Sequence, residues 1–154
     1  MRTESACTVV VMDDGKANAL SLPMLHALDA ALDIAEGRGL PAVLAGRPGV
    51  FSGGFDLKVM TGDDARARTD MVFAGFEVAY RTLASDIPVV VACTGHAIAM
   101  GVFLMVTGDR RIGAGGEYRI GANETALGIV MPDFATELLR GRLTPSAADR
   151  ALLT

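Results

Sequence analysis

Short apolar runs separated by longer mixed segments predict that strands and helices alternate along this chain. Three runs are typical of buried strands because valine and other small or branched apolar residues follow one another without a charge. They cover residues 7–12 ("CTVVVM"), 41–46 ("PAVLAG") and 88–93 ("PVVVAC"). Shorter runs at residues 110–113 ("RRIG") and 117–121 ("EYRIG") predict two further strands.

Between the first three runs, apolar residues recur three or four positions apart, which is the spacing of one face of an α-helix. The first helix is expected to follow Ser21 as its cap, to hold Pro23 in its first turn and to end at Gly37. Its buried side chains are predicted to be Leu25, Leu28, Leu32 and Ala35. A longer helix over residues 63–85 is predicted to bury Val72, Phe76, Ala79 and Leu83.

In the second half of the chain, the sequence pattern predicts shorter helices and strands. Residues 94–101 ("TGHAIAMG") are expected to form a glycine-bearing loop, and residues 102–108 a helix or a short buried segment. Helices are also expected over residues 134–140 and 146–153. The alternation predicts an α/β fold in which helices cover a sheet. We expect a single domain over residues 1–154.

Composition excludes several classes of protein. The 154 residues are 51% hydrophobic and carry a net charge of −4 with no basic run, which argues against a nucleic-acid-binding surface. The longest largely apolar stretch after His96, residues 97–106, is too short to cross a bilayer. No signal-peptide pattern opens the chain, and Cys7 and Cys93 lie in apolar runs typical of free thiols. The chain is therefore expected to be soluble and cytoplasmic, without a membrane partner.

Common cofactor motifs are absent from the sequence. It contains no glycine-rich dinucleotide fingerprint, no phosphate-binding P-loop and no nucleophile elbow. His26 and His96 have no neighbour at a spacing that metal ligands use. We therefore expect neither a metal nor a redox cofactor.

Two junctions stand out because each pairs a buried strand with a glycine turn and a following helix. They cover residues 51–58 ("FSGGFDLK") and 94–104. Glycine lets a backbone approach a ligand closely, and a helix start leaves N–H groups unpaired. Either junction alone is explained as a tight turn. Together they could direct two backbone donors at one point, as in a site that stabilises an oxyanion.

Glu124 adds a group that can move a proton. It lies between two glycines in an apolar neighbourhood, where loss of water would raise the pKa of its carboxyl. A carboxyl with a raised pKa suits general acid–base catalysis near neutral pH. An exposed loop residue or a helix cap is the simpler interpretation.

Four segments in this order and spacing resemble the enoyl-CoA hydratase/isomerase (crotonase) superfamily. They are "GKANALS", "FSGGFDLK", "IPVVVACTGHAIAMGVFLMVTGDRRIG" and "NETALGIVMP". The resemblance implies a crotonase-like spiral of ββα units whose C-terminal helical region is absent or truncated in this chain. It also implies an acyl-CoA thioester as substrate, with coenzyme A only as part of that substrate, and a homotrimer or a dimer of trimers.

The resemblance also implies roles for particular residues. The backbone N–H groups of Phe55 and Met100 would stabilise the thioester enolate, and Glu124 would be the acid–base residue. The segment around the substrate would consist of Lys16, Ala17, Phe55, Asp56, Leu57, Lys58, Met100, Gly101 and Phe103.

Phe103 stands where typical hydratases of this family place the first of two glutamates. Hydration uses two acid–base groups, whereas moving a double bond needs only one base. The resemblance therefore predicts an enoyl-CoA hydratase or isomerase of fatty acyl-CoA metabolism. A non-catalytic acyl-CoA-binding or assembly subunit and another enolate reaction, such as thioester hydrolysis, remain the alternatives.

Overall fold

The computed structural model describes residues 2–4, 6–122, 124 and 130–153. Six helices and eight strands are assigned in these ranges. The strands are β1 (Arg2–Glu4), β2 (Cys7–Val11), β3 (Ala42–Ala45), β4 (Gly49–Ser52), β5 (Val89–Cys93), β6 (Gly95–Ile98), β7 (Arg110–Gly113) and β8 (Ile120–Gly121). The helices are α1 (Leu22–Gly37), α2 (Leu57–Met60), α3 (Ala65–Leu83), α4 (Met100–Thr107), α5 (Asp133–Arg142) and α6 (Pro145–Leu153).

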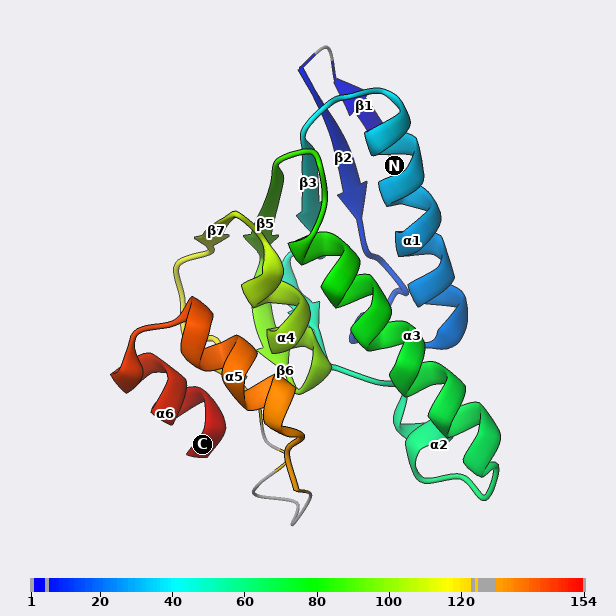
Figure 1. Ribbon diagram of the computed structural model, residues 1–154, viewed down its shortest axis with the longest axis vertical. Coiled ribbons are helices and arrows are strands. Elements are labelled where there is room, and N and C mark those ends of the chain that lie inside the picture. The colour runs from blue at the N-terminus through cyan, green and yellow to red at the C-terminus, as the bar shows by residue number, and fades with distance from the viewer. Residues whose placement is uncertain (1, 5, 123, 125–129, 154) are drawn as a thin grey trace.

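The strands form two sheets (Figure 1). A five-stranded sheet has the order β1-β2-β3-β5-β7, in which only β1 runs antiparallel to its neighbour. A three-stranded sheet has the order β4-β6-β8, and its strands are parallel. The predicted α/β class is confirmed.

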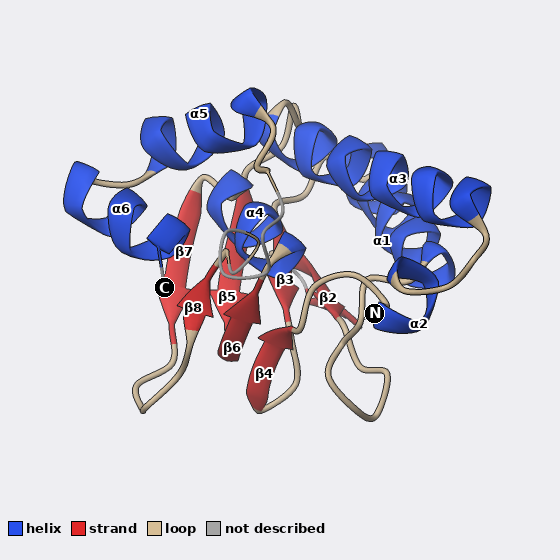
Figure 2. Ribbon diagram, turned by 90° about the horizontal axis from the view of Figure 1, so that it is seen from below, coloured by secondary structure: helices blue, strands red, loops and turns tan. Residues whose placement is uncertain are grey.

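Helix α4 lies between the strands and the outer helices α3 and α5 (Figure 2). All eight of its residues are buried, as expected for a helix that is apolar on every side. Its last carbonyl groups accept hydrogen bonds from Arg111 and Arg142, which satisfy the acceptors that a helix end leaves free. Helix α4 is therefore the centre of the core beside the smaller sheet.

Local sequence explains where α1 and α3 begin. The Ser21 hydroxyl accepts a hydrogen bond from the Met24 N–H at 3.4 Å, and Pro23 lies in the first turn of α1, as predicted. The Asp64 carboxylate caps α3 through the Ala67 N–H at 2.9 Å. Helix α1 ends at Gly37, but the residue with a left-handed backbone is Gly39, whose φ is +60°.

The buried face of α3 differs from the prediction. Ala79 is buried, but Val72 and Phe76 are only half-buried and Leu83 is 40% exposed. The buried residues are Met71, Gly75, Val78, Ala79 and Thr82. Glycine and threonine do not count in an apolar periodicity, so the predicted stripe was rotated by about one position.

Three strands were missed, and one of them is β1 (Arg2–Glu4) at the start of the chain. Residues 94–101 were expected to form a loop, but Gly95–Ile98 is β6, and Gly49–Ser52 before the Gly-Gly turn is β4. The predicted strand at residues 117–121 is limited to β8. Cys7 and Cys93 are free, as expected, although Cys7 is only half-buried. No helix in the described part of the chain is long and apolar enough to cross a membrane.

Candidate active site

The two glycine junctions lie side by side because the strands before them are hydrogen-bonded neighbours. Strands β4 and β6 are parallel, so their carboxyl ends reach the same edge of the small sheet. Gly54 has φ +88°, and a Cβ added there would lie 2.9 Å from the Ala99 Cβ and 3.4 Å from the Met100 nitrogen. Only a glycine permits both this backbone conformation and this contact.

The second junction contains a strained residue. Ala99 has φ +50° and ψ −126°, a region that L-residues other than glycine rarely adopt. Its N–H donates to the Gly121 carbonyl at 3.0 Å, and its carbonyl accepts from the Val102 N–H at 2.9 Å. These bonds hold the turn that directs the next residue, Met100, into the start of α4.

Phe55 and Met100 each present a backbone N–H that has no acceptor among the described residues. Met100 is the first residue of α4, whose cap Ala99 provides no side-chain acceptor. The residue before Phe55 is fixed by the hydrogen bond from the Leu20 N–H to the Gly54 carbonyl at 2.8 Å. Met100 is buried, and backbone donors in a protein interior are almost always paired. Its unpaired N–H, at a junction that touches the one holding the half-buried Phe55, therefore indicates a site for an acceptor.

The ring of Phe55 packs over Gly75 of α3. A Cβ added at Gly75 would lie only 2.5 Å from the Phe55 Cε1 atom and 3.6 Å from the Met100 Cγ atom. The missing side chain at Gly75 therefore makes room for the large residue that follows the Gly-Gly turn.

A groove of about 460 Å³ runs along the first junction. The substrate-binding residues predicted in this part of the chain all line it, namely Lys16, Ala17, Phe55, Asp56, Leu57 and Lys58. Gly53 and Gly54 of the predicted glycine turn line it too, as do Asp14 and Ala19, which the sequence analysis did not single out.

The wall of the groove formed by residues 14–19 is held by two side chains. The Asp14 carboxylate accepts hydrogen bonds from the N–H groups of Lys16, Asn18 and Ala19 at 2.7–2.9 Å. The buried Asn18 amide donates to the carbonyls of Met12 and Phe51 at 2.9 and 3.1 Å. The polar run "DDGKAN" contains the turn-forming residues that could have indicated this clamp.

Glu124 follows the third strand of the small sheet. Strand β8 is parallel to β6, with Gly121 opposite Ile98, so the segment after β8 leaves from the same edge as the two junctions. The Oε2 atom of Glu124 is buried and has no hydrogen-bond partner within the described part of the chain, and burial raises the pKa of this carboxyl. Most of "NETALGIVMP", residues 123 and 125–129, lies outside the described residues.

Met100, Gly101 and Phe103, the other predicted substrate-binding residues, lie in α4 and do not line the groove of residues 14–19 and 53–58. Phe103 is 1% exposed, and its ring centroid lies 5.9 Å from that of Phe76. Position 103 is therefore part of the hydrophobic core.

The arrangement combines groups suited to one kind of chemistry. Unpaired N–H groups can hold an oxygen on which negative charge develops, and a carboxyl with a raised pKa can take up and return a proton. The groove carries Lys16 and Lys58, whose ammonium groups suit an anionic ligand.

Comparison with known proteins gives one consistent result. The sequence profile of the family "Enoyl-CoA hydratase/isomerase" matches residues 2–154. Human mitochondrial enoyl-CoA delta isomerase 1 is 37% identical over 145 residues, covering 88% of this chain and 46% of that protein.

Solved structures agree with the sequence matches. The probable enoyl-CoA hydratase EchA3 of Mycobacterium tuberculosis is 47% identical with a TM-score of 0.92, covering 98% of this chain and 64% of that one. Human mitochondrial delta3-delta2-enoyl-CoA isomerase is 34% identical with a TM-score of 0.83, covering 94% of this chain and 58% of that one. The chain thus spans about half the length of its curated relatives and somewhat under two thirds of these solved structures.

Proposed function

The chain belongs to the enoyl-CoA hydratase/isomerase family, and we propose that it moves the double bond of an enoyl-CoA thioester. The observation that carries the proposal is the pair of unpaired N–H groups of Phe55 and Met100 at two touching junctions. The human sequence match and the human structure are both named as mitochondrial enoyl-CoA isomerases, which supports this choice of reaction.

The first step would be capture of the thioester oxygen. The carbonyl oxygen accepts a hydrogen bond from each of the two N–H groups. When the neighbouring carbon loses a proton, negative charge moves onto this oxygen, and both hydrogen bonds become stronger. Because the donors are fixed before the reaction, they stabilise the enolate without reorganisation, and loss of one such donor typically lowers kcat about 10²- to 10³-fold.

Glu124 would move the proton. In a 3-enoyl-CoA its carboxylate takes a proton from carbon 2, and the electron pair spreads into an enolate conjugated with the double bond. The same carboxyl then returns the proton to carbon 4, which leaves the double bond between carbons 2 and 3. Burial raises the pKa of Glu124, so the carboxylate is a stronger base than a solvated one.

Phe103 favours isomerisation over hydration. Addition of water needs a group that activates the water and a second that delivers a proton. Position 103 holds a buried aromatic ring that packs on Phe76 and cannot ionise. Isomerisation uses one base for both proton steps, so Glu124 alone suffices.

The groove beside Phe55 would hold coenzyme A. Lys16 and Lys58 provide positive charge for its phosphates, and Ala17 and Leu57 provide apolar wall. Asp14 and Asp56 also line the groove, and their carboxylates accept hydrogen bonds from N–H groups of their own turns. These bonds hold the two carboxylates against the protein backbone.

Hydration is the second candidate, because one of the solved structures at 47% identity, EchA3 of Mycobacterium tuberculosis, is described as a probable enoyl-CoA hydratase. One assay separates the possibilities. The protein is incubated with a 3-enoyl-CoA and, separately, with a 2-enoyl-CoA, and products are analysed by chromatography with mass spectrometry. Isomerisation changes retention without changing mass, whereas hydration adds the mass of water. A protein that only binds acyl-CoA changes neither, and that result would contradict the proposal.

A further inference from the structure

Strand β4 contains a bulge directly before the Gly-Gly turn. Gly49 pairs with Gly95 and Val50 with His96, but the next pair is Ser52 with Ala97, so Phe51 is an extra residue. Successive residues of a regular strand point to opposite faces, yet Phe51 and Ser52 are both fully buried. The bulge thus turns Ser52 into the interior, as bulges beside functional sites often do.

The hydroxyl of Ser52 joins two segments of the site. It donates to the Asn18 carbonyl at 2.8 Å, which belongs to the wall of the coenzyme A groove. It accepts from the Gly54 N–H at 3.1 Å, one residue before the donor of Phe55. Both contacts are buried, so water does not replace them when the hydroxyl is removed.

Ser52 also touches the second junction. A Cβ added at Gly101 would lie 2.7 Å from the Ser52 carbonyl oxygen, 2.9 Å from its Cβ and 3.2 Å from its Oγ. Gly101 directly follows Met100, so the first turn of α4 rests on Ser52. One buried side chain therefore contacts the residues next to both backbone donors.

We infer that Ser52 is a positioning residue that sets the spacing between the Phe55 N–H and the Met100 N–H. Its hydroxyl holds Gly54 through the hydrogen bond, and its backbone and Cβ support Gly101. Without the hydroxyl, the Gly54 N–H loses its buried acceptor, and the turn is free to shift against α4. This inference rests on the proposed function, because the spacing matters only if both donors bind one oxygen.

The test compares Ser52→Ala with Thr82→Val. Thr82 is also buried, and its hydroxyl donates to the Val78 carbonyl at 2.7 Å. Thr82 is a residue of α3 and lies beside Leu32 of α1 and Leu44 of the five-stranded sheet. Both variants thus remove one buried hydroxyl, but only Ser52 is next to the donors. Thermal melting records the stability of each.

The first readout is turnover of a 3-enoyl-CoA. We expect Ser52→Ala to lower kcat about 10- to 100-fold and to change KM by less than about threefold, because misplaced donors weaken mainly the transition state. Thr82→Val should keep the wild-type kcat. The second readout is the carbonyl stretching band of bound butanoyl-CoA labelled with ¹³C at carbon 1, which does not isomerise. Two aligned donors lower this frequency, and we expect a smaller shift in Ser52→Ala.

The outcomes distinguish failure of the inference about Ser52 from failure of the proposed function. Wild-type kcat and band position in folded Ser52→Ala would overturn the inference, as would equal losses of kcat in Thr82→Val. If wild-type protein shows neither turnover nor a band shift, the proposed function itself fails. If Ser52→Ala does not fold, Ser52→Cys, which keeps the volume but hydrogen-bonds weakly, replaces it under the same criteria. Failure of both to fold would assign Ser52 to folding and overturn the inference.

Discussion

The two sheets of this molecule use their backbones differently. In the five-stranded sheet, Ala42–Ala45 of β3 pairs without interruption with β2 on one side and β5 on the other. The three-stranded sheet contains a bulge at Phe51 and ends in turns where Gly54 and Ala99 have positive φ. Strand β3 is thus paired along both of its edges, whereas the turns after β4 and β6 hold the N–H groups of Phe55 and Met100, which have no acceptor among the described residues.

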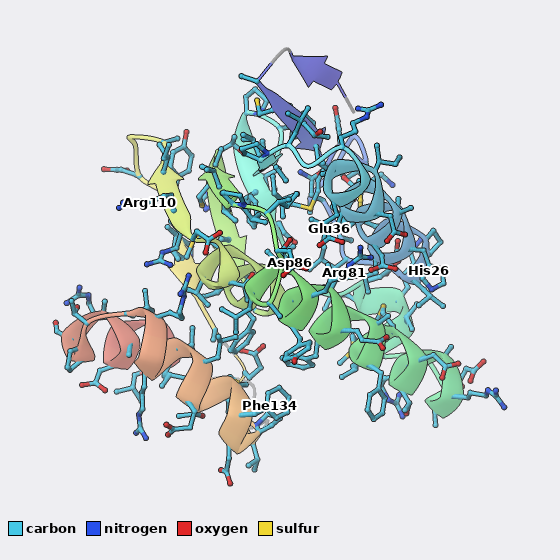
Figure 3. The ribbon with its side chains drawn as sticks, turned by 45° about the horizontal axis from the view of Figure 1, so that its top comes forward. His26, Glu36, Arg81, Asp86, Arg110 and Phe134 are labelled. Carbon is cyan, nitrogen blue, oxygen red and sulfur yellow. The ribbon has the colours of Figure 1, made fainter. Side chains whose placement is uncertain are left out.

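Two helices that cover the large sheet, α1 and α3, are joined by ion pairs between their own side chains. Arg81 of α3 reaches α1, where it contacts Asp29, Asp33 and Glu36 at 2.5–2.8 Å (Figure 3). Beyond the end of β8 in the small sheet, by contrast, the Oε2 atom of Glu124 is buried and meets no hydrogen-bond partner among the residues that the structure describes. The paired charges of Arg81 thus lie over the large sheet, whereas Glu124 and the donors of Phe55 and Met100 lie beside the small sheet.

The largest effect is expected from Glu124→Gln, which keeps the size of the side chain but removes the proton acceptor. Turnover of a 3-enoyl-CoA should fall at least ~100-fold with little loss of acyl-CoA binding, since acid–base catalysis is typically worth that much. Kinetics and calorimetric binding measure the two quantities. Unchanged turnover in a folded variant would contradict the assigned role.

Glu124→Gln is expected to lower activity but to raise the stability of the protein at neutral pH. Burial raises the pKa of Glu124, so the folded state binds this proton more tightly than the unfolded state. Stability from this group is present at acid pH, below the unfolded pKa, and is lost as pH rises through the folded pKa. Glu124→Gln should therefore raise the melting temperature at neutral pH but not at acid pH. A lower melting temperature at neutral pH would show that the carboxylate has a stabilising partner.

The next effect is expected from a pair of glycine variants. Gly54→Ala places a Cβ 2.9 Å from Ala99, whereas Gly39→Ala, also at positive φ, meets no atom within 4 Å. Both should lose roughly 1–2 kcal/mol through backbone strain. Only Gly54→Ala should also lower kcat, by about 100-fold, because it pushes the donors apart. Equal kcat values in the two folded variants would separate the turn from catalysis.

A smaller effect is expected in the other region. Arg81→Met removes the network to α1 and should cost about 1 kcal/mol of unfolding free energy without changing kcat. Arg66→Met, which breaks an exposed 3.7 Å pair with Asp70, is the matched control and should be nearly neutral. A large fall in kcat for Arg81→Met would show that the two regions are not independent.

Arg81→Met should also change how the free energy of unfolding depends on pH in the acid range. The hydrogen bond from Arg81 lowers the pKa of Glu36, so the stabilisation is present above the unfolded pKa of this carboxyl. It is lost as pH falls through the lowered folded pKa. Melting curves between neutral and acid pH should therefore converge for wild type and Arg81→Met at the acid end.

The regular region could be predicted from the sequence. The strands β2 and β5 are recognisable from their valine-rich runs, which are typical of strands buried on both faces. The start of α1 is recognisable from its cap, Ser21. Both signals depend only on residues that are neighbours in the sequence. The strands of the small sheet could not be predicted, since "GVFS" and "GHAI" each begin with glycine and are too short to show a period.

The sequence predicted those parts of the site that are marked by motifs in a fixed order along the chain. The groove residues from Lys16 to Lys58 came from a family resemblance, and the structure brings them together. Ser52 and Gly75 could not be found that way, because their roles depend on contacts with Gly101 and Phe55 that only the folded packing creates. The buried face of α3 was predicted wrongly because Gly75 and Thr82 are buried there but do not count in an apolar periodicity.

The most direct test of the central claim is an NMR titration of the two backbone donors. At 16.0 kDa the protein allows the amide resonances of Phe55 and Met100 to be followed as butanoyl-CoA is added. A thioether analogue that lacks the carbonyl oxygen is the control. The account predicts that both amide protons move downfield with butanoyl-CoA and not with the thioether, while Lys16 and Ala17 respond to both. Movement at Lys16 and Ala17 without a carbonyl-dependent shift at Phe55 and Met100 would contradict it.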